Sequence, residues 1–134
     1  TGIVMSLDLV DMEKIENVVF YRGNFLEQKT KNKIMSFFDK NIDVIISDMA
    51  ANTTGNKTLD CIRTNQLCAD VMVFSHEILK PNGVLVSKIF MGEDFIEIKE
   101  LARSKFKKVQ FFKPESSKNE SKETYVHCAT LRTL

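Results

Sequence analysis

The sequence predicts an α/β fold with a mostly parallel sheet, and two observations support this. Short apolar runs alternate with longer helical patterns along the 134 residues, which is the order expected of strands joined by helices. One of these runs, residues 42–47 (IDVIIS), is almost continuously apolar, as expected of a strand buried on both faces. No internal repeat or linker divides the chain, so we expect a single domain.

The first part of the chain is predicted to contain strands at residues 2–10, 18–21 and 42–47. The first is an apolar run that contains Asp8 near its end and reads as a buried strand. Between the second and third strands, Asn24 can cap a helix of residues 24–40. The apolar anchors of that helix would be Phe25, Leu26, Ile34, Phe37 and Phe38.

After a polar loop, a long helix is predicted over residues 59–79 and is closed by the turn sequence KPNG at 80–83. A buried strand at 84–90 (VLVSKIF), a helix at 94–106 and strands at 109–112 and 124–130 follow. A loop of about ten residues joins the last two strands, which suits an antiparallel pair better than a parallel crossover.

Composition excludes several classes of protein. The formal net charge of +1 predicts no partner by itself, and no apolar run approaches the length of a membrane span. The three cysteines form no CxxC pair, which favours a reducing, cytoplasmic location over a disulfide framework or zinc site. His76 and His127 lack metal-ligand spacing, so no metal is predicted.

Polar side chains collect at the predicted carboxyl ends of the strands, where ligands of parallel α/β sheets bind. Asp8, Asn24 and Asp48 follow or end three strands, and Lys88 lies within the fourth. Glu123 opens the last strand, whose reversed direction would bring its start to the same edge. Asp8 and Asp48 could each merely cap a loop.

Lys88 interrupts an apolar strand, although lysine is rarely buried without a partner. One interpretation is a structural ion pair with Asp48. The other is a base, because a lysine held in a semi-buried site can have its pKa lowered.

Three segments carry a resemblance to a known family. Residues 44–55 (VIISDMAANTTG) look like the pattern SDMAxNxTG, and Asp60 and Arg63 follow at the same spacing as in relatives. Residues 79–93 (LKPNGVLVSKIFMGE) are similar to LxPGGxxVxKxFxGE, and residues 113–125 (KPESSKNESKETY) to KPxSSRxxSxExY. The chain thereby resembles the FtsJ family of S-adenosylmethionine-dependent RNA 2'-O-ribose methyltransferases. Asn82 takes the place of the first glycine in the second pattern, and Ala51 stands where many relatives have proline.

The resemblance implies a Rossmann-like class I methyltransferase sheet with an antiparallel C-terminal strand, and residues 1–134 would form a partial domain that begins at the family's second strand. The missing first strand would leave two unpaired edges, so we expect chain–chain association and weak cofactor binding by these residues alone.

The resemblance also assigns roles to individual residues. Asp48, Lys88 and Glu123 match three of the four members of the family's catalytic Lys-Asp-Lys-Glu set, and the first lysine has no counterpart. Asp8 matches the acid that binds the cofactor's ribose. Asn24, with Phe25 beside it, lies where relatives usually have an aspartate near the adenine, and Asp48 would also face the cofactor.

The resemblance implies that the substrate is a uridine of large-subunit ribosomal RNA, with the assembled subunit as one form in which the enzyme could meet it. Residues 103–122 hold seven basic and two acidic side chains, so Lys113, Lys118 and Lys122 are predicted to contact RNA, unless this is only a solvated face. Two alternatives stay open. One is a non-catalytic RNA-binding module, and the other is an NAD-dependent oxidoreductase that uses Asp8 for a nicotinamide ribose.

Overall fold

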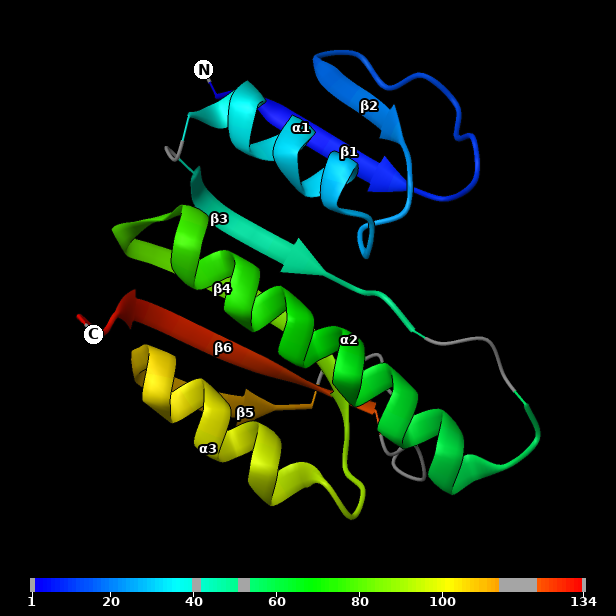
Figure 1. Ribbon diagram of the computed structural model, residues 1–134, viewed down its shortest axis with the longest axis vertical. Helices are drawn as coiled ribbons and strands as arrows, with labels where there is room; N and C mark the ends of the chain where they lie inside the picture. The colour runs from blue at the N-terminus through cyan, green and yellow to red at the C-terminus, as the bar shows by residue number, and fades with distance from the viewer. Residues whose placement is uncertain (1, 40–41, 51–53, 114–122, 134) are drawn as a thin grey trace. The chain divides into compact units, whose positions relative to one another are not determined.

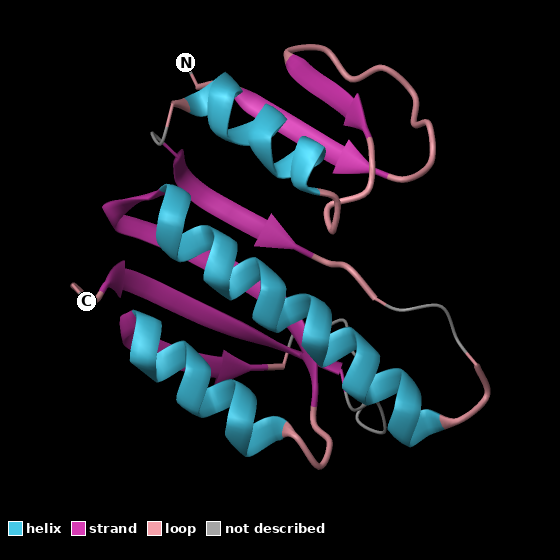
Figure 2. Ribbon diagram, viewed as in Figure 1, coloured by secondary structure: helices cyan, strands magenta, loops and turns pink. Residues whose placement is uncertain are grey.

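The computed structural model describes residues 2–39, 42–50, 54–113 and 123–133. They fall into two compact units, Thr1–Asp39 and Lys40–Leu134, and each is described by itself. Strands and helices alternate along most of the chain (Figure 2), which confirms the predicted α/β class.

The first unit is a two-stranded parallel sheet followed by one helix. Strand β1 (Val4–Asp8) pairs with β2 (Val18–Arg22), and helix α1 (Gln28–Phe38) comes next. Asp8 lies opposite Arg22 at the carboxyl end of the pair.

The prediction that Asn24 caps α1 is wrong. Residues 25–27 first form a turn, in which the Glu27 amide donates to the Asn24 carbonyl. The Asn24 side-chain oxygen accepts the Leu26 amide at 3.0 Å, and the helix begins one turn later, with Glu27 at its N-cap. An asparagine side chain satisfies a turn in the same way as a helix end, so the local pattern did not separate the two.

The second unit is a four-stranded sheet with the strand order β3-β4-β6-β5. Its elements, in chain order, are β3 (Ile42–Ser47), α2 (Lys57–Ile78), β4 (Leu79–Phe90), α3 (Phe95–Lys105), β5 (Phe106–Phe112) and β6 (Glu123–Leu131). β3 and β4 are parallel, whereas β6 is antiparallel to both β4 and β5. The predicted antiparallel C-terminal pair is therefore confirmed.

Helices α2 and α3 lie on the same face of this sheet (Figure 1). That face carries the side chains of Leu85, Ile89, Val126 and Cys128, all fully buried, and the core is completed from α2 by residues such as Met72. Burial raises the pKa of Cys68 to about 11 and that of Cys128 to about 12. These thiols are therefore protonated core residues at neutral pH.

The predicted closing turn at residues 80–83 is also wrong, because β4 starts at Leu79 directly after α2. A register shift between Ile42 and Val44 lets the longer strand pair with β3. Gly83 is needed there, since a Cβ at this position would lie 2.9 Å from the Lys80 carbonyl oxygen.

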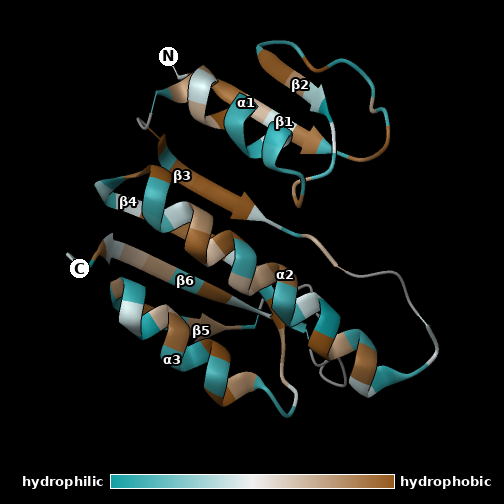
Figure 3. Cartoon of the chain, in the orientation of Figure 1, coloured by the Kyte–Doolittle hydropathy of each residue, from teal (hydrophilic) through white to brown (hydrophobic). Residues whose placement is uncertain are grey.

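The predictions of a buried β1 and of a β3 buried on both faces are not met. β3 is hydrophobic along most of its length (Figure 3), yet Val44 is 54% and Ile46 73% exposed, and Val4 in β1 is 53% exposed. The two described helices of the second unit lie on the opposite face of its sheet, which leaves Val44 and Ile46 uncovered. β1 and β3 each pair along one edge among the described residues, so association through the other edge stays a prediction.

Within the described residues, no helix has both the length and the apolar character that a membrane crossing requires.

Candidate active site on the four-stranded sheet

Strand pairing brings three side chains together that lie far apart in the sequence. Lys88 of β4 lies opposite Tyr125 of β6, and Phe90 lies opposite Glu123. Asp48 follows Ser47, which pairs with Ser87 at the end of the parallel β3–β4 ladder. Asp48 and Glu123 therefore flank Lys88 from the two neighbouring strands.

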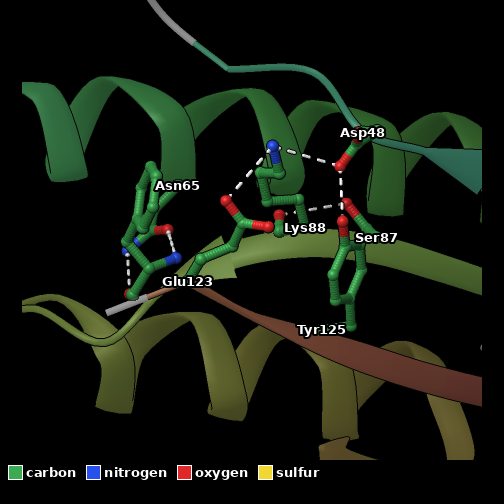
Figure 4. A network of polar contacts seen from close by, with 7 residues as sticks. Asp48, Asn65, Ser87, Lys88, Glu123 and Tyr125 are labelled. Atoms are coloured by element: carbon green, nitrogen blue, oxygen red, sulfur yellow. Dashed lines mark hydrogen bonds and ion pairs between the residues drawn. The ribbon is translucent and has the colours of Figure 1, made fainter. Parts of the chain in front are cut away.

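The ammonium group of Lys88 makes an ion pair with both acids (Figure 4). Its Nζ lies 3.1 Å from Asp48 Oδ1 and 3.5 Å from Glu123 Oε2. The Lys88 side chain is only 14% exposed, whereas that of Asp48 is 65% exposed. A lysine this buried needs acidic partners. The two ion pairs confirm the prediction that Asp48, Lys88 and Glu123 converge. The pairing by itself fits a structural lysine and a catalytic lysine equally well.

Tyr125 is a fourth member of the cluster that sequence reasoning missed. Its hydroxyl donates to Asp48 Oδ1 at 2.6 Å (Figure 4). This hydrogen bond raises the pKa of Tyr125, as do burial and the charges of Asp48 and Glu123. The phenol is therefore a stable donor that orients Asp48 at neutral pH. The available signal was its position two residues after Glu123, on the same side of the strand.

Asn65 of α2 was also missed, and it holds the end of β4 in place. Its Nδ2 donates to the Phe90 carbonyl at 2.9 Å and to Asp94 Oδ1 at 2.8 Å, while its Oδ1 accepts the Phe90 amide at 2.8 Å. The side chain is fully buried. It belongs to the buried stripe Cys61, Asn65, Cys68 and Met72 of α2, and a polar residue on such a stripe signals a buried amide with partners.

We expect Asn65→Ala to lower the free energy of unfolding by about 2–4 kcal/mol, because it leaves buried backbone groups and Asp94 without partners. Urea denaturation of the purified variant measures this loss. Gln66→Ala, one residue away at an exposed position, should change stability by less than about 0.5 kcal/mol. Equal effects of the two substitutions would show that the buried amide is unimportant.

Asp60 of α2 forms hydrogen bonds with Thr54, in the segment that follows Asp48. Asp60 Oδ1 accepts the Thr54 hydroxyl at 2.7 Å and the Thr54 amide at 2.9 Å. These hydrogen bonds from Thr54 lower the pKa of Asp60, which is therefore ionised at neutral pH. Residues 51–53 of the motif that resembles SDMAxNxTG lie outside the described residues.

The predicted cofactor residues of the first unit are described within that unit alone. Asp8 is exposed at the end of β1, and its Oδ1 accepts the Val10 amide at 3.3 Å. Asn24 is half-buried in the turn after β2. Phe25 is 8% exposed, and the Lys31 ammonium lies 5.1 Å from the centre of its ring. The Phe25 ring is thus a core side chain of this unit rather than an open surface.

Of the predicted RNA contacts, Lys113 is exposed directly after β5. Lys118 and Lys122 lie outside the described residues.

Comparison with solved structures places the fold among methyltransferases. A crystal structure of a ribosomal RNA methyltransferase from Plasmodium falciparum is similar, with a TM-score of 0.84 and 25% identity over 98% of this chain and 73% of that one. A Streptococcus mutans methyltransferase in complex with SAH has a TM-score of 0.53 at 17% identity, over 96% of this chain and 71% of that one. The second likeness supports the fold alone.

Sequence comparison agrees. A protein named ribosomal RNA large subunit methyltransferase E from Pelagibacter ubique is 46% identical over 132 residues, which cover 98% of this chain and 65% of that protein. A protein of the same name from Rickettsia akari is 41% identical over 92% of this chain and 54% of its own length. The chain thus spans between about half and two thirds of these curated relatives. The model of the FtsJ-like methyltransferase family matches residues 1–131, and the chain therefore belongs to this family.

Proposed function

We propose that the protein transfers a methyl group from S-adenosylmethionine to a ribose 2'-hydroxyl of large-subunit ribosomal RNA, at a uridine. The observation that carries this proposal is Lys88, which is held between Asp48 and Glu123 and lies beside the Asp48–Tyr125 hydrogen bond. The names of the relatives support ribosomal RNA of the large subunit as the substrate. A cytoplasmic location, where ribosomes are assembled, follows from the same proposal.

The residues at the carboxyl end of the first sheet fit the adenosine part of the cofactor. A carboxylate such as Asp8 can accept hydrogen bonds from both hydroxyls of a ribose, and its exposure leaves room for them. The Asn24 amide group donates no hydrogen bond within the described residues, so it is available to an adenine nitrogen. Because Phe25 is buried, we assign it to the wall that supports Asn24. Asp48, largely exposed, would face both the cofactor and the RNA.

When bound, the cofactor supplies a methyl group on a positively charged sulfur. Lys88, as the neutral amine, would orient the 2'-oxygen of the RNA toward that methyl group and would accept the proton of the hydroxyl. Asp48 and Glu123 orient the Lys88 amine and balance its charge. Tyr125 fixes Asp48 in turn, so the group that acts on the proton is positioned from two sides.

The direct test uses the full-length protein with methyl-labelled S-adenosylmethionine and large ribosomal subunits from cells that lack the enzyme. We expect label in RNA, and nuclease digestion should recover it as a 2'-O-methyl nucleotide. Label on a base, or label in protein, would contradict the proposal.

Two further measurements separate the alternatives. Calorimetric titration should detect S-adenosylmethionine binding and no NAD binding, and the opposite result would favour the oxidoreductase. RNA binding without methyl transfer by the full-length protein would favour a non-catalytic module.

Replacing Lys113, Lys118 and Lys122 with glutamine is expected to weaken RNA binding and reduce its dependence on salt. Each lost phosphate contact should reduce the slope of log affinity against log salt by about 0.7–0.9. Filter binding over a salt series measures the slope. Lys29→Gln with Lys33→Gln, two exposed positions of α1, is the control. An unchanged slope in the triple variant would mean that these lysines form only a solvated face.

A further inference from the structure

An exposed aromatic side chain, Phe112, lies beside the Lys88 cluster on the four-stranded sheet. This cluster consists of Lys88, Asp48, Glu123 and Tyr125. Phe112, the last residue of β5, lies opposite Tyr125 of β6. The two rings are stacked, with their centroids 5.9 Å apart and their planes at 23°. Phe112 is nevertheless 45% exposed, so part of its ring is open to a ligand. A large aromatic side chain exposed next to a candidate active site calls for an explanation.

Phe112 lies in the same row across the strands as Lys88, the candidate catalytic lysine. Tyr125 is the partner of Phe112 on β5 and also the partner of Lys88 on β4. Lys88, Tyr125 and Phe112 therefore form one row across three adjacent strands. Neighbouring strands lie about 4.8 Å apart, so the backbone at Phe112 is about 10 Å from that at Lys88. This is a separation that one or two nucleotides of an RNA chain can span.

The surroundings favour an anionic, base-bearing ligand. Side chains alternate along a strand, so Lys108 and Gln110 share the face of Phe112, and both are exposed. From residue 103 to residue 113 the chain has five basic side chains and no acidic one. An exposed ring on a strand that also carries exposed basic side chains matches a nucleobase with its phosphates, whereas an apolar peptide would have no need of the positive charge.

We infer that Phe112 is a stacking platform for a nucleobase of single-stranded RNA, at or next to the nucleotide whose ribose reaches Lys88. The inference rests on the proposed function and adds how the RNA is held. Stacking does not depend on base identity but requires an unpaired base, so the platform selects an unpaired segment of RNA. Tyr125 would then serve both sides, because its ring supports Phe112 and its hydroxyl holds Asp48.

The chain contains no tryptophan, so Phe112→Trp places a fluorescent reporter at the platform. We expect a short single-stranded RNA to quench its emission when the base stacks on the indole. Inorganic polyphosphate, a polyanion without bases, should bind the basic surface without quenching. Equal quenching by both polymers, or quenching by neither, would overturn the inference.

Affinity provides an independent measurement in the full-length protein. Phe112→Ala should weaken binding of single-stranded RNA by about 5- to 150-fold, the effect of removing one base–aromatic stack. Phe112→Tyr should bind RNA about as tightly as wild type. Phe112→Leu should bind as weakly as Phe112→Ala, since leucine keeps the apolar bulk but lacks the π-face. S-adenosylmethionine affinity should stay unchanged in all three variants. Ile96→Ala, which alters an exposed apolar side chain of α3, is the control for general loss of apolar surface.

The outcomes separate this inference from the proposed function. If wild type methylates RNA and Phe112→Ala binds RNA as tightly as wild type, the platform is refuted and the function stands. If Phe112→Ala loses RNA affinity while wild type transfers no methyl group, the platform stands and the function fails. If Phe112→Ala binds free RNA normally but loses affinity for the large subunit, Phe112 contacts protein and the inference is wrong.

Discussion

Replacing Lys88 with alanine in the full-length protein is expected to reduce methyl transfer by about 10²–10⁴-fold, the usual contribution of general-base assistance. Affinity for S-adenosylmethionine should remain nearly intact, because Lys88 lies between two acids and, in the proposed function, acts on the RNA hydroxyl rather than on the cofactor. Single-turnover transfer rates and calorimetric titration of the same preparation measure the two quantities. Transfer at more than about a tenth of the wild-type rate would remove Lys88 from a catalytic role.

Two further variants sharpen this test. Lys88→Arg keeps a positive charge for Asp48 and Glu123 but cannot give up its proton, so it should fold normally and remain inactive. Lys80→Ala removes a lysine of the same strand that pairs with Asp43 at 2.9 Å, and it should leave transfer unchanged. An active Lys88→Arg variant would mean that Lys88 orients the hydroxyl without accepting its proton.

Replacing Asp48 with alanine is expected to lower both methyl transfer and cofactor affinity. The change leaves the Lys88 ammonium with Glu123 as its one acidic partner among the described residues and removes the acceptor of the Tyr125 hydroxyl. Lys88 would keep one of its two ion pairs, so its side chain should be held less firmly in the catalytic position. Transfer rates at saturating RNA, together with cofactor binding by calorimetry, separate the two effects.

Cofactor affinity that is unchanged in Asp48→Ala would confine Asp48 to proton handling. Tyr125→Phe is the matched variant, because it keeps the ring against Phe112 and removes only the hydroxyl that donates to Asp48. We expect it to slow transfer much less than Asp48→Ala. A loss as large as that of Asp48→Ala would make the phenol itself part of the reaction.

The alternation of apolar runs and helical patterns was sufficient to predict the class of the fold and the order of its elements. The run at Ile42–Ser47 has the predicted bounds, and the short polar connection before β6 correctly indicated an antiparallel pair. Because strand ends of a parallel sheet share one edge, the sequence also predicted that Asp48, Lys88 and Glu123 would meet. These inferences succeed because they depend on the backbone geometry of strands, which local sequence controls.

Two features depended on tertiary structure instead. The β4 strand begins at Leu79, which pairs with Ile42, and residues 80–83 fall in the register shift before Val84 pairs with Val44, so the KPNG segment lies within the strand and does not close the helix. The β3 side chains Val44 and Ile46 are exposed, although their hydrophobicity predicted burial. Whether an apolar side chain is covered depends on which elements pack on it, and strand composition carries no information about that.

By itself, the sequence determined the α/β class, the order of the elements and the three charged residues that converge at the candidate site. The tertiary structure alone decided how these charges are held. Asn65 holds the end of β4 and Tyr125 orients Asp48, each through a contact between elements distant in sequence, and Phe112 stacks on Tyr125 across the paired strands β5 and β6. Such contacts arise from strand order and helix placement, so a pattern read along one segment cannot contain them.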